Sequence, residues 1–359
     1  GTRGISLFIV PKYHLDADGK PGAPNDVTCV SIEHKIGIHA SPTCVMAYGE
    51  QDECIGEMIG GEFGGMKAMF TMMNNARINV GSQGVQIAER ATQQASQFAA
   101  ERIQSARAGS GDKAPVAIIE HPDVRRMLLR SKALTQAARA LLYYATSSVD
   151  RATLGIEGAK SRAEILTPLI KGYGTDIGNE VASIGVQVHG GMGFIEETGA
   201  GQHFRDARIA PIYEGTNGIQ AADLVGRKLG LDGGEAMATL IADIRSEARE
   251  DENLLALANA CEDIMRWMAS GDASIDDRLA GSYAFMTMLA TATCGMLMKK
   301  QHRIASAELA SGDDPFLKAK LVTTRYYLDH IVPEALGLKA AAIGGADILY
   351  RLSSAELAG

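Results

Sequence analysis

The spacing of apolar residues changes at Met66, and this change limits the fold class of the chain. From Met66 the apolar residues recur with the period of a helix, which predicts one long helix that runs to about Ile103. Its apolar face consists of Met66, Met69, Phe70, Met73, Val80, Gly84, Ile87, Ala91, Ala95 and Phe98. Before Met66, short apolar runs between turn residues predict strands at 5–10, 27–33 and 43–48.

Three further helices are predicted before residue 230. The second helix begins near Glu120 with Pro122 in its first turn, the third spans about 161–188, and the fourth runs from Thr216 to about Leu229, where Gly230 ends it. The third helix carries Gly172, Gly174, Gly178 and Gly185. Because glycine has no side chain, these positions would allow another helix to approach closely.

A glycine-rich boundary at 230–234 precedes a second helical region. Amphipathic segments follow at 235–269, 276–308, 314–337 and 345–354. Short breaks between such segments are typical of an antiparallel helical bundle. This region has no constellation of catalytic side chains, so its expected role is packing or an interface.

Composition excludes several classes of function. The chain has 359 residues and a net charge of −8, which argues against a nucleic-acid-binding protein. It contains no run of 18 apolar residues, so no membrane span is predicted. Its five cysteines are scattered without a CxxC motif, which favours reduced, buried thiols in a cytoplasmic protein. No histidine or cysteine spacing predicts a metal site.

The segment Ile212–Gln220, with the sequence IYEGTNGIQ, is the strongest candidate for chemistry. Glu214 stands between an aromatic residue and Gly215, just before a helix that Thr216 can cap. A carboxylate beside a glycine, where a substrate can come close to the backbone, suits a general base. The alternative is an ordinary acidic residue near the start of a helix.

Three sequence blocks, in this order and spacing, resemble the acyl-CoA dehydrogenase family: VQVHGGMGF at 186–194, RDARI at 205–209 and IYEGT at 212–216. The stretches at 31–44 and 69–77 resemble the longer subfamily that has an extra C-terminal helical domain and includes 3-methylmercaptopropionyl-CoA dehydrogenases. The resemblance covers essentially the whole chain, and its start matches the middle of the family's β-domain. It implies that an N-terminal domain is lacking and that the chain alone is incomplete.

The resemblance implies an α+β, mostly α fold in three parts. These are the C-terminal half of a middle β-domain at 1–62, an acyl-CoA dehydrogenase-like four-helix bundle at 63–232, and an additional helical domain at 233–359.

The resemblance also implies a reaction, in which FAD takes a hydride from Cβ of an acyl-CoA while Glu214, as the catalytic base, takes the α-proton. The residues implied to bind FAD are Arg102, Gln187, Val188, His189, Gly190, Gly191, Thr216, Asn217 and Gly218. The residues implied to bind the substrate are Asn74, Arg77 and Gly215. Gly218 departs from the glutamine or glutamate common in the family.

Alternatives remain for several of these residues. Arg102 is otherwise an exposed arginine at a helix end, Arg77 a surface charge, and Gly190 with Gly191 an ordinary turn. The implied partners are an electron-transfer flavoprotein and further copies of the chain, as a homodimer or homotetramer. Other possible functions are an acyl-CoA oxidase-like enzyme and a non-catalytic helical oligomerisation fragment.

Overall fold

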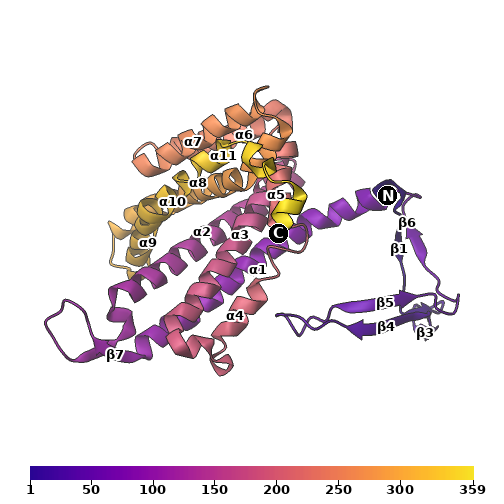
Figure 1. The fold of residues 1–359 in the computed structure, drawn as a ribbon, viewed down its shortest axis with the longest axis horizontal. Helices are drawn as coiled ribbons and strands as arrows, with labels where there is room; N and C mark the ends of the chain where they lie inside the picture. The colour runs from indigo at the N-terminus through magenta and orange to yellow at the C-terminus, as the bar shows by residue number, and fades with distance from the viewer. The chain divides into compact units, whose positions relative to one another are not determined.

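The computed structural model describes residues 1–359, apart from the side chains of Thr2 and Thr71. The chain forms two compact units, Gly1–Ala76 and Arg77–Gly359. Helices dominate and the strands are few and short, so the predicted mostly α fold is confirmed (Figure 1). The finer division into three domains at 62/63 and 232/233 stays a prediction.

The first unit contains three antiparallel two-stranded ladders. They pair β1 (Leu7–Ile9) with β6 (Glu57–Ile59), β2 (Tyr13–Leu15) with β3 (Pro21–Pro24), and β4 (Val27–Ile32) with β5 (Cys44–Tyr48). The three predicted strands correspond to β1, β4 and β5. Three strands, β2, β3 and β6, were not predicted. For β3 the reason is that its two prolines and one glycine are typical of a turn.

The buried side chain of Asn25 connects segments of this unit that lie far apart in sequence. Its amide nitrogen donates to the carbonyls of Pro11 (2.7 Å) and Ile55 (2.8 Å), and its amide oxygen accepts from the Ile55 N–H at 2.8 Å. Cys29, Cys44 and Cys54 are not buried, so the expectation of buried thiols is wrong for them and holds for Cys261 and Cys294.

Three long helices carry the second unit. They are α1 (Gly65–Glu101), which enters this unit at Arg77, α2 (Pro122–Thr153) and α3 (Ala159–His189). Between α1 and α2, β7 (Ile103–Ala106) pairs with β8 (Pro115–Ala117), and the 3-10 turn Ile118–Glu120 follows. The predicted ends of α1 and α3 and the predicted start of α2 are correct to within two residues.

Glycines let α1 and α3 touch at their backbones. A Cβ atom on Gly84 would lie 2.3 Å from the carbonyl oxygen of Gly174, and one on Gly178 would lie 2.8 Å from the Cα of Gly84. Real Cβ contacts are not this short, so only glycine fits at this crossing. The predicted close contact along the third helix is confirmed.

Helices of 5 to 35 residues, and short turns between several of them, follow α3. They are the 3-10 turns Gly190–Phe194 and Glu196–Thr198, α4 (Ala200–Ala207), α5 (Asn217–Asp223), the π-turn Leu224–Lys228, α6 (Glu235–Glu247), α7 (Glu252–Ala269), α8 (Ile275–Leu309), α9 (Pro315–Tyr326), the π-turn Tyr327–Ile331, α10 (Val332–Leu336), α11 (Lys339–Ile343) and α12 (Ser354–Ala358).

One predicted helix is in fact two. The segment 235–269 divides into α6 and α7 because Asp251 caps a new helix, its carboxylate accepting from the Leu254 N–H at 3.0 Å. The predicted helix 314–337 contains the π-turn between α9 and α10, and α4 was not predicted.

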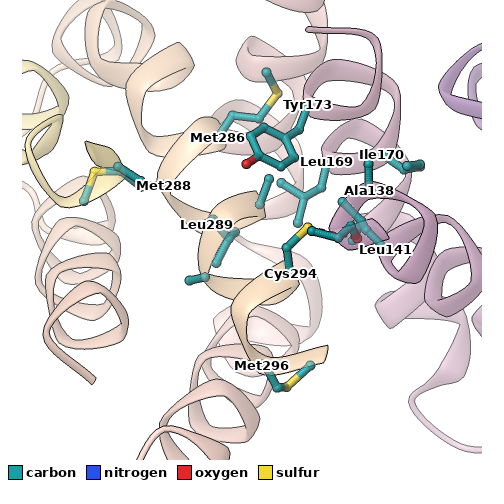
Figure 2. Packing of buried hydrophobic residues seen from close by; sticks show 14 of the residues in the cluster. Ala138, Leu141, Leu169, Ile170, Tyr173, Met286, Met288, Leu289, Cys294 and Met296 are labelled. Atoms are coloured by element: carbon teal, nitrogen blue, oxygen red, sulfur yellow. Dashed lines mark hydrogen bonds between the residues drawn. The ribbon is translucent and has the colours of Figure 1, made fainter. Parts of the chain in front are cut away.

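A continuous hydrophobic core joins α2, α3 and α8 (Figure 2). Leu141 of α2, Leu169 of α3 and Leu289 of α8 are fully buried in it. The Tyr173 hydroxyl lies 3.2 Å from the Tyr327 hydroxyl within this core. No helix among the described residues is long and apolar enough to cross a bilayer.

Candidate functional site

A closed loop from Pro211 to Asn217 carries Glu214. The Asn217 N–H donates to the Pro211 carbonyl at 2.9 Å, which joins the two ends of the loop. Between them, Glu214 has φ 55° and Gly215 has φ 81°. Glycine adopts this left-handed conformation freely, whereas a residue with a Cβ atom loses on the order of 1 kcal/mol there. The contacts around the loop therefore hold Glu214 in a conformation it would not prefer alone.

The Glu214 carboxylate is half-buried and uncommitted. No residue that the structure describes forms a hydrogen bond or ion pair with it, and none accepts from the Glu214 backbone N–H. The adjacent Tyr213 hydroxyl donates to the side-chain carbonyl of Gln83 on α1. Burial raises the pKa of Tyr213, and the Glu214 charge raises it further, so this hydroxyl stays protonated near neutral pH.

Asn217 anchors the loop to α3. Its side chain is only 3% exposed. The amide nitrogen donates to Gly172 O at 3.1 Å, Thr175 Oγ1 at 2.9 Å and Asp176 Oδ1 at 2.8 Å. The amide oxygen accepts from Lys171 Nζ at 2.9 Å. Because these contacts occupy the side chain, a contact with a cofactor would have to come from the backbone.

The polar network continues through Asp176 to α8. The Tyr283 hydroxyl donates to Asp176 Oδ2 at 2.6 Å. Burial raises the pKa of Asp176, against the hydrogen bonds from Tyr283 and Asn217. Burial lowers the pKa of Lys171 to about 8, and the charges of Asp176 and Glu214 oppose that shift. Tyr283 belongs to the region for which the sequence indicated only a packing role, and it contacts this network directly.

Arg77 lies beneath the loop in an ion pair. Its side chain is 5% exposed and lies 3.6 Å from the carboxylate of buried Asp223, which also pairs with Arg227. The alternative of a surface charge is therefore wrong. Asn74 is exposed and belongs to the first unit.

Gly215 meets a buried glutamine. The Gln220 side chain donates to the Gly215 carbonyl at 3.3 Å, and a Cβ on Gly215 would lie 2.9 Å from Gln220 Nε2. The positive φ favours glycine at 215, and an added Cβ would displace the Gln220 amide. Thr216 caps α5, as predicted, by accepting from the Ile219 N–H at 3.2 Å, and both Thr216 and Gly218 are exposed.

A second group of predicted residues lies at the far end of α3. Arg102 is exposed directly after α1. The His189 ring stacks on Phe98 at 4.4 Å between centroids, so the ends of α1 and α3 meet here. Gln187 is exposed and Val188 is buried in a small apolar cluster.

This end has exposed glycine backbone at 190–191 and the exposed side chain of Arg102. Gly190 and Gly191 are exposed and would have nothing within 4 Å of an added Cβ. An exposed guanidinium and open glycine backbone each suit contact with a phosphate-bearing group.

The predicted residues therefore fall into two groups rather than one. Gly215, Thr216, Asn217 and Gly218 surround Glu214, with Arg77 beneath, while Arg102 and the 187–191 segment lie elsewhere. Gln187 is 12 residues beyond Thr175 on α3, which is about 18 Å along the helix. The sequence analysis missed Lys171, Asp176 and Tyr283. A lysine within the apolar run LTPLIKGYG at 166–174 was the available signal for the first of these.

Two family models match the chain. "Acyl-CoA dehydrogenase, C-terminal domain" matches residues 64–229, and "Acetyl-CoA dehydrogenase C-terminal like" matches residues 235–353. The chain is 44% identical to a 3-methylmercaptopropionyl-CoA dehydrogenase from Ruegeria pomeroyi, over 93% of this chain and 59% of that protein. It spans about 60% of the length of that protein and of three further curated relatives.

Solved structures share the fold. Caenorhabditis elegans ACDH-11, solved in complex with C11-CoA, superposes with a TM-score of 0.74 at 21% identity, over 92% of this chain and 53% of that one. An acyl-CoA dehydrogenase complexed with FAD from Bacillus anthracis superposes with a TM-score of 0.68 at 20% identity, over 93% of this chain and 59% of that one.

Proposed function

Because the chain belongs to the acyl-CoA dehydrogenase family, we propose that it acts in the FAD-dependent α,β-dehydrogenation of an acyl-CoA thioester to the 2-enoyl-CoA. The observation that carries the proposal is the uncommitted Glu214 carboxylate, held on the strained Pro211–Asn217 loop.

Glu214 is the proposed base. A general base must have a lone pair free to accept the proton and must be placed at the reacting carbon. The described residues leave both oxygens of Glu214 free, and the closed loop fixes its backbone. In the proposed reaction, Glu214 takes the proton from Cα, a hydride leaves Cβ, and the electron pair of the broken Cα–H bond forms the new double bond.

The Glu214 backbone N–H is the proposed donor to the thioester carbonyl. This carbonyl gains negative charge as the α-proton leaves, and a fixed donor stabilises that charge. The N–H has no acceptor among the described residues, so it is available for this contact. Gly215 is the proposed substrate-contacting glycine, because its bare backbone permits close approach.

FAD, when bound, supplies the acceptor for the hydride. The residues proposed to hold it are Arg102 with the segment 187–191, and the backbone of 216–218. We propose that the two groups serve two different flavins in a homodimer or homotetramer, as the resemblance to the family implies. An electron-transfer flavoprotein is the proposed electron acceptor.

Acyl-CoA is the proposed substrate, with Asn74 and Arg77 near its CoA portion. Arg77 is already paired with Asp223. We therefore propose that its role is to support the loop from below and to add positive potential, rather than to leave Asp223 for a phosphate.

Glu214→Gln in the natural protein tests the assignment of the base. The amide cannot accept the proton, so acyl-CoA-dependent flavin reduction should fall by about 10²- to 10⁴-fold while flavin content and acyl-CoA binding persist. Rapid anaerobic mixing with a panel of acyl-CoA thioesters measures the rate. Glu157→Gln makes the same change at an exposed acid between α2 and α3 and should react like the parent. Near-parental flavin reduction by Glu214→Gln would refute the role.

A further inference from the structure

Lys171 is a charged side chain inside the helical core. It lies in the middle of α3 and is 0% exposed. Removing an ammonium from water costs several kcal/mol unless strong partners replace the water. Lys171 nevertheless donates to a single neutral acceptor, the amide oxygen of Asn217, at 2.9 Å. Packing alone would favour an apolar residue here.

The lysine, together with Gly172 O and Asp176, fixes which way the Asn217 amide faces. An ammonium group can only donate, so the group opposite it must be the carbonyl oxygen of the amide. The amide nitrogen then faces the acceptors Gly172 O and Asp176 Oδ1. Thr175 cannot decide this orientation, because its hydroxyl lies within hydrogen-bond distance of both ends of the amide, 3.3 Å and 2.9 Å, and can donate or accept.

The amide orientation is transmitted to the loop. The backbone N–H of the same Asn217 closes the loop on Pro211, three residues after Glu214. If the amide turned over, its nitrogen would face the ammonium and its oxygen would face the Asp176 carboxylate. Both contacts would be repulsive, and the closure of the loop would lose its anchor on α3.

Charges from several elements surround this point. The charges of Asp176 on α3 and of Glu214 on the loop raise the pKa of Lys171, and the charge of Arg77 on α1 lowers it. Asp223 of α5 pairs with Arg77, while Tyr283 of α8 and Arg208 act on Asp176. Since Asp176 and Glu214 are acidic, the lysine is also the cation that balances the two carboxyl groups.

We propose that Lys171 is a positioning residue for the reaction. It fixes the Asn217 amide and thereby the placement of Glu214 against the α-carbon of the substrate. This inference rests on the proposed function, because the placement of Glu214 matters only if Glu214 is the base.

Lys171→Met in the natural protein is the first test. Methionine fills a similar volume without a charge, so the variant loses the cost of a buried ammonium but leaves Asp176 without this cation, and the two effects on the melting temperature oppose each other. Its kcat for acyl-CoA dehydrogenation should fall about 10- to 100-fold, the effect of a small misplacement, with flavin content and KM near parental values. A purely structural lysine predicts an unchanged kcat per folded protein, whatever the melting temperature.

Lys171→Gln tests the donor-only argument with a polar residue that preserves solubility. Its amide can donate or accept, so only Gly172 O and Asp176 Oδ1 still hold the Asn217 amide in one orientation, and kcat should again fall. The coupling is tested with Asn217→Ala. If the two residues act as one unit, the double variant Lys171→Met/Asn217→Ala should be no slower than the slower single variant.

Lys320→Met is the matched control. Lys320 is half-buried, whereas Lys171 is fully buried; like Lys171 it donates to amide oxygens, those of Gln136 at 2.7 Å and Gln301 at 2.9 Å, but it lies on α9. Its kcat should equal that of the parent. Parental kcat in both Lys171 variants, or independent effects in the double variant, would overturn the inference. If instead the parent is inactive toward every acyl-CoA, the proposed function itself fails.

Discussion

At the scale of the residue, two unfavourable placements coincide. Glu214 occupies a left-handed backbone conformation, and Lys171 carries a charge into a fully buried position. Each costs stability, and both are connected to Asn217: Lys171 donates to its side chain, and the Asn217 backbone N–H closes the loop that carries Glu214. Strain and buried charge of this kind concentrate where they serve a function, which agrees with a catalytic role for this loop.

The buried lysine should give the stability of the protein a characteristic pH dependence. Lys171 has a pKa of about 8 when folded and 10.5 as its ordinary value, so between these values the unfolded state binds the extra proton. Stability should therefore rise with pH in this window, by up to about 3 kcal/mol, relative to a variant without the lysine. Denaturation midpoints of parent and Lys171→Met from pH 7 to 10.5 measure the difference.

Below pH 8 both states of Lys171 are protonated, and the difference between the two proteins should be constant. Lys113→Met, which changes an exposed lysine of the β7–β8 loop, should follow the parent throughout. A parent and Lys171→Met with parallel curves up to pH 10.5 would mean that Lys171 is not held at a lowered pKa.

At the scale of the element, the contact between α1 and α3 decides how the site is built. The two helices meet at Gly84, Gly174 and Gly178 with backbone against backbone. This contact places α3, and with it Lys171 and Asp176, against the loop that carries Glu214. The closeness of two helices is thus a requirement of the site as well as of the core.

Gly84→Ala should weaken this crossing strongly. The new methyl group would lie 2.3 Å from a backbone oxygen, which cannot move aside as a side chain can. The free energy of unfolding should fall by about 1–3 kcal/mol or more, as measured by chemical denaturation. Gly226→Ala is the control, because it has open space around it and should be neutral or more stable by up to about 1 kcal/mol. Equal stability of Gly84→Ala and the parent would contradict the packing.

At the scale of the whole molecule, the residues proposed to bind FAD are divided between two places. Arg102 and the 187–191 segment lie at the joined ends of α1 and α3, away from the Glu214 loop. In the proposed oligomer each protomer contributes residues to two flavin sites, and each flavin contacts two protomers. The exposed cation and the open glycines at this end agree with the proposed contact to phosphates.

Arg102→Ala should reduce flavin retention more than it changes the fold. The flavin absorbance of the purified protein should drop, while its melting temperature, measured without added flavin, stays at the parental value. Arg107→Ala removes an exposed arginine from the nearby β7–β8 loop and should retain its flavin. Analytical ultracentrifugation measures the oligomeric state. A monomer that holds its full complement of FAD would exclude a site shared between subunits.

Local patterns allowed the sequence by itself to determine much of this protein. The helical period and the end signals placed both ends of α1 and α3 and the start of α2 within two residues, because these signals depend only on neighbouring residues. The glycines of α3 predicted a close helix contact, and IYEGT identified the candidate base and its helix cap.

Only the tertiary structure decided the surroundings of that base. Lys171 meets Asn217 across 46 residues of chain, and Tyr283 meets Asp176 across 107. Arg77 resembled a surface charge until the fold brought buried Asp223 beside it. Such pairings arise when distant helices pack together, and no periodicity within one segment encodes them. Residue types therefore identified the carboxylate, while packing determined which groups hold it in place.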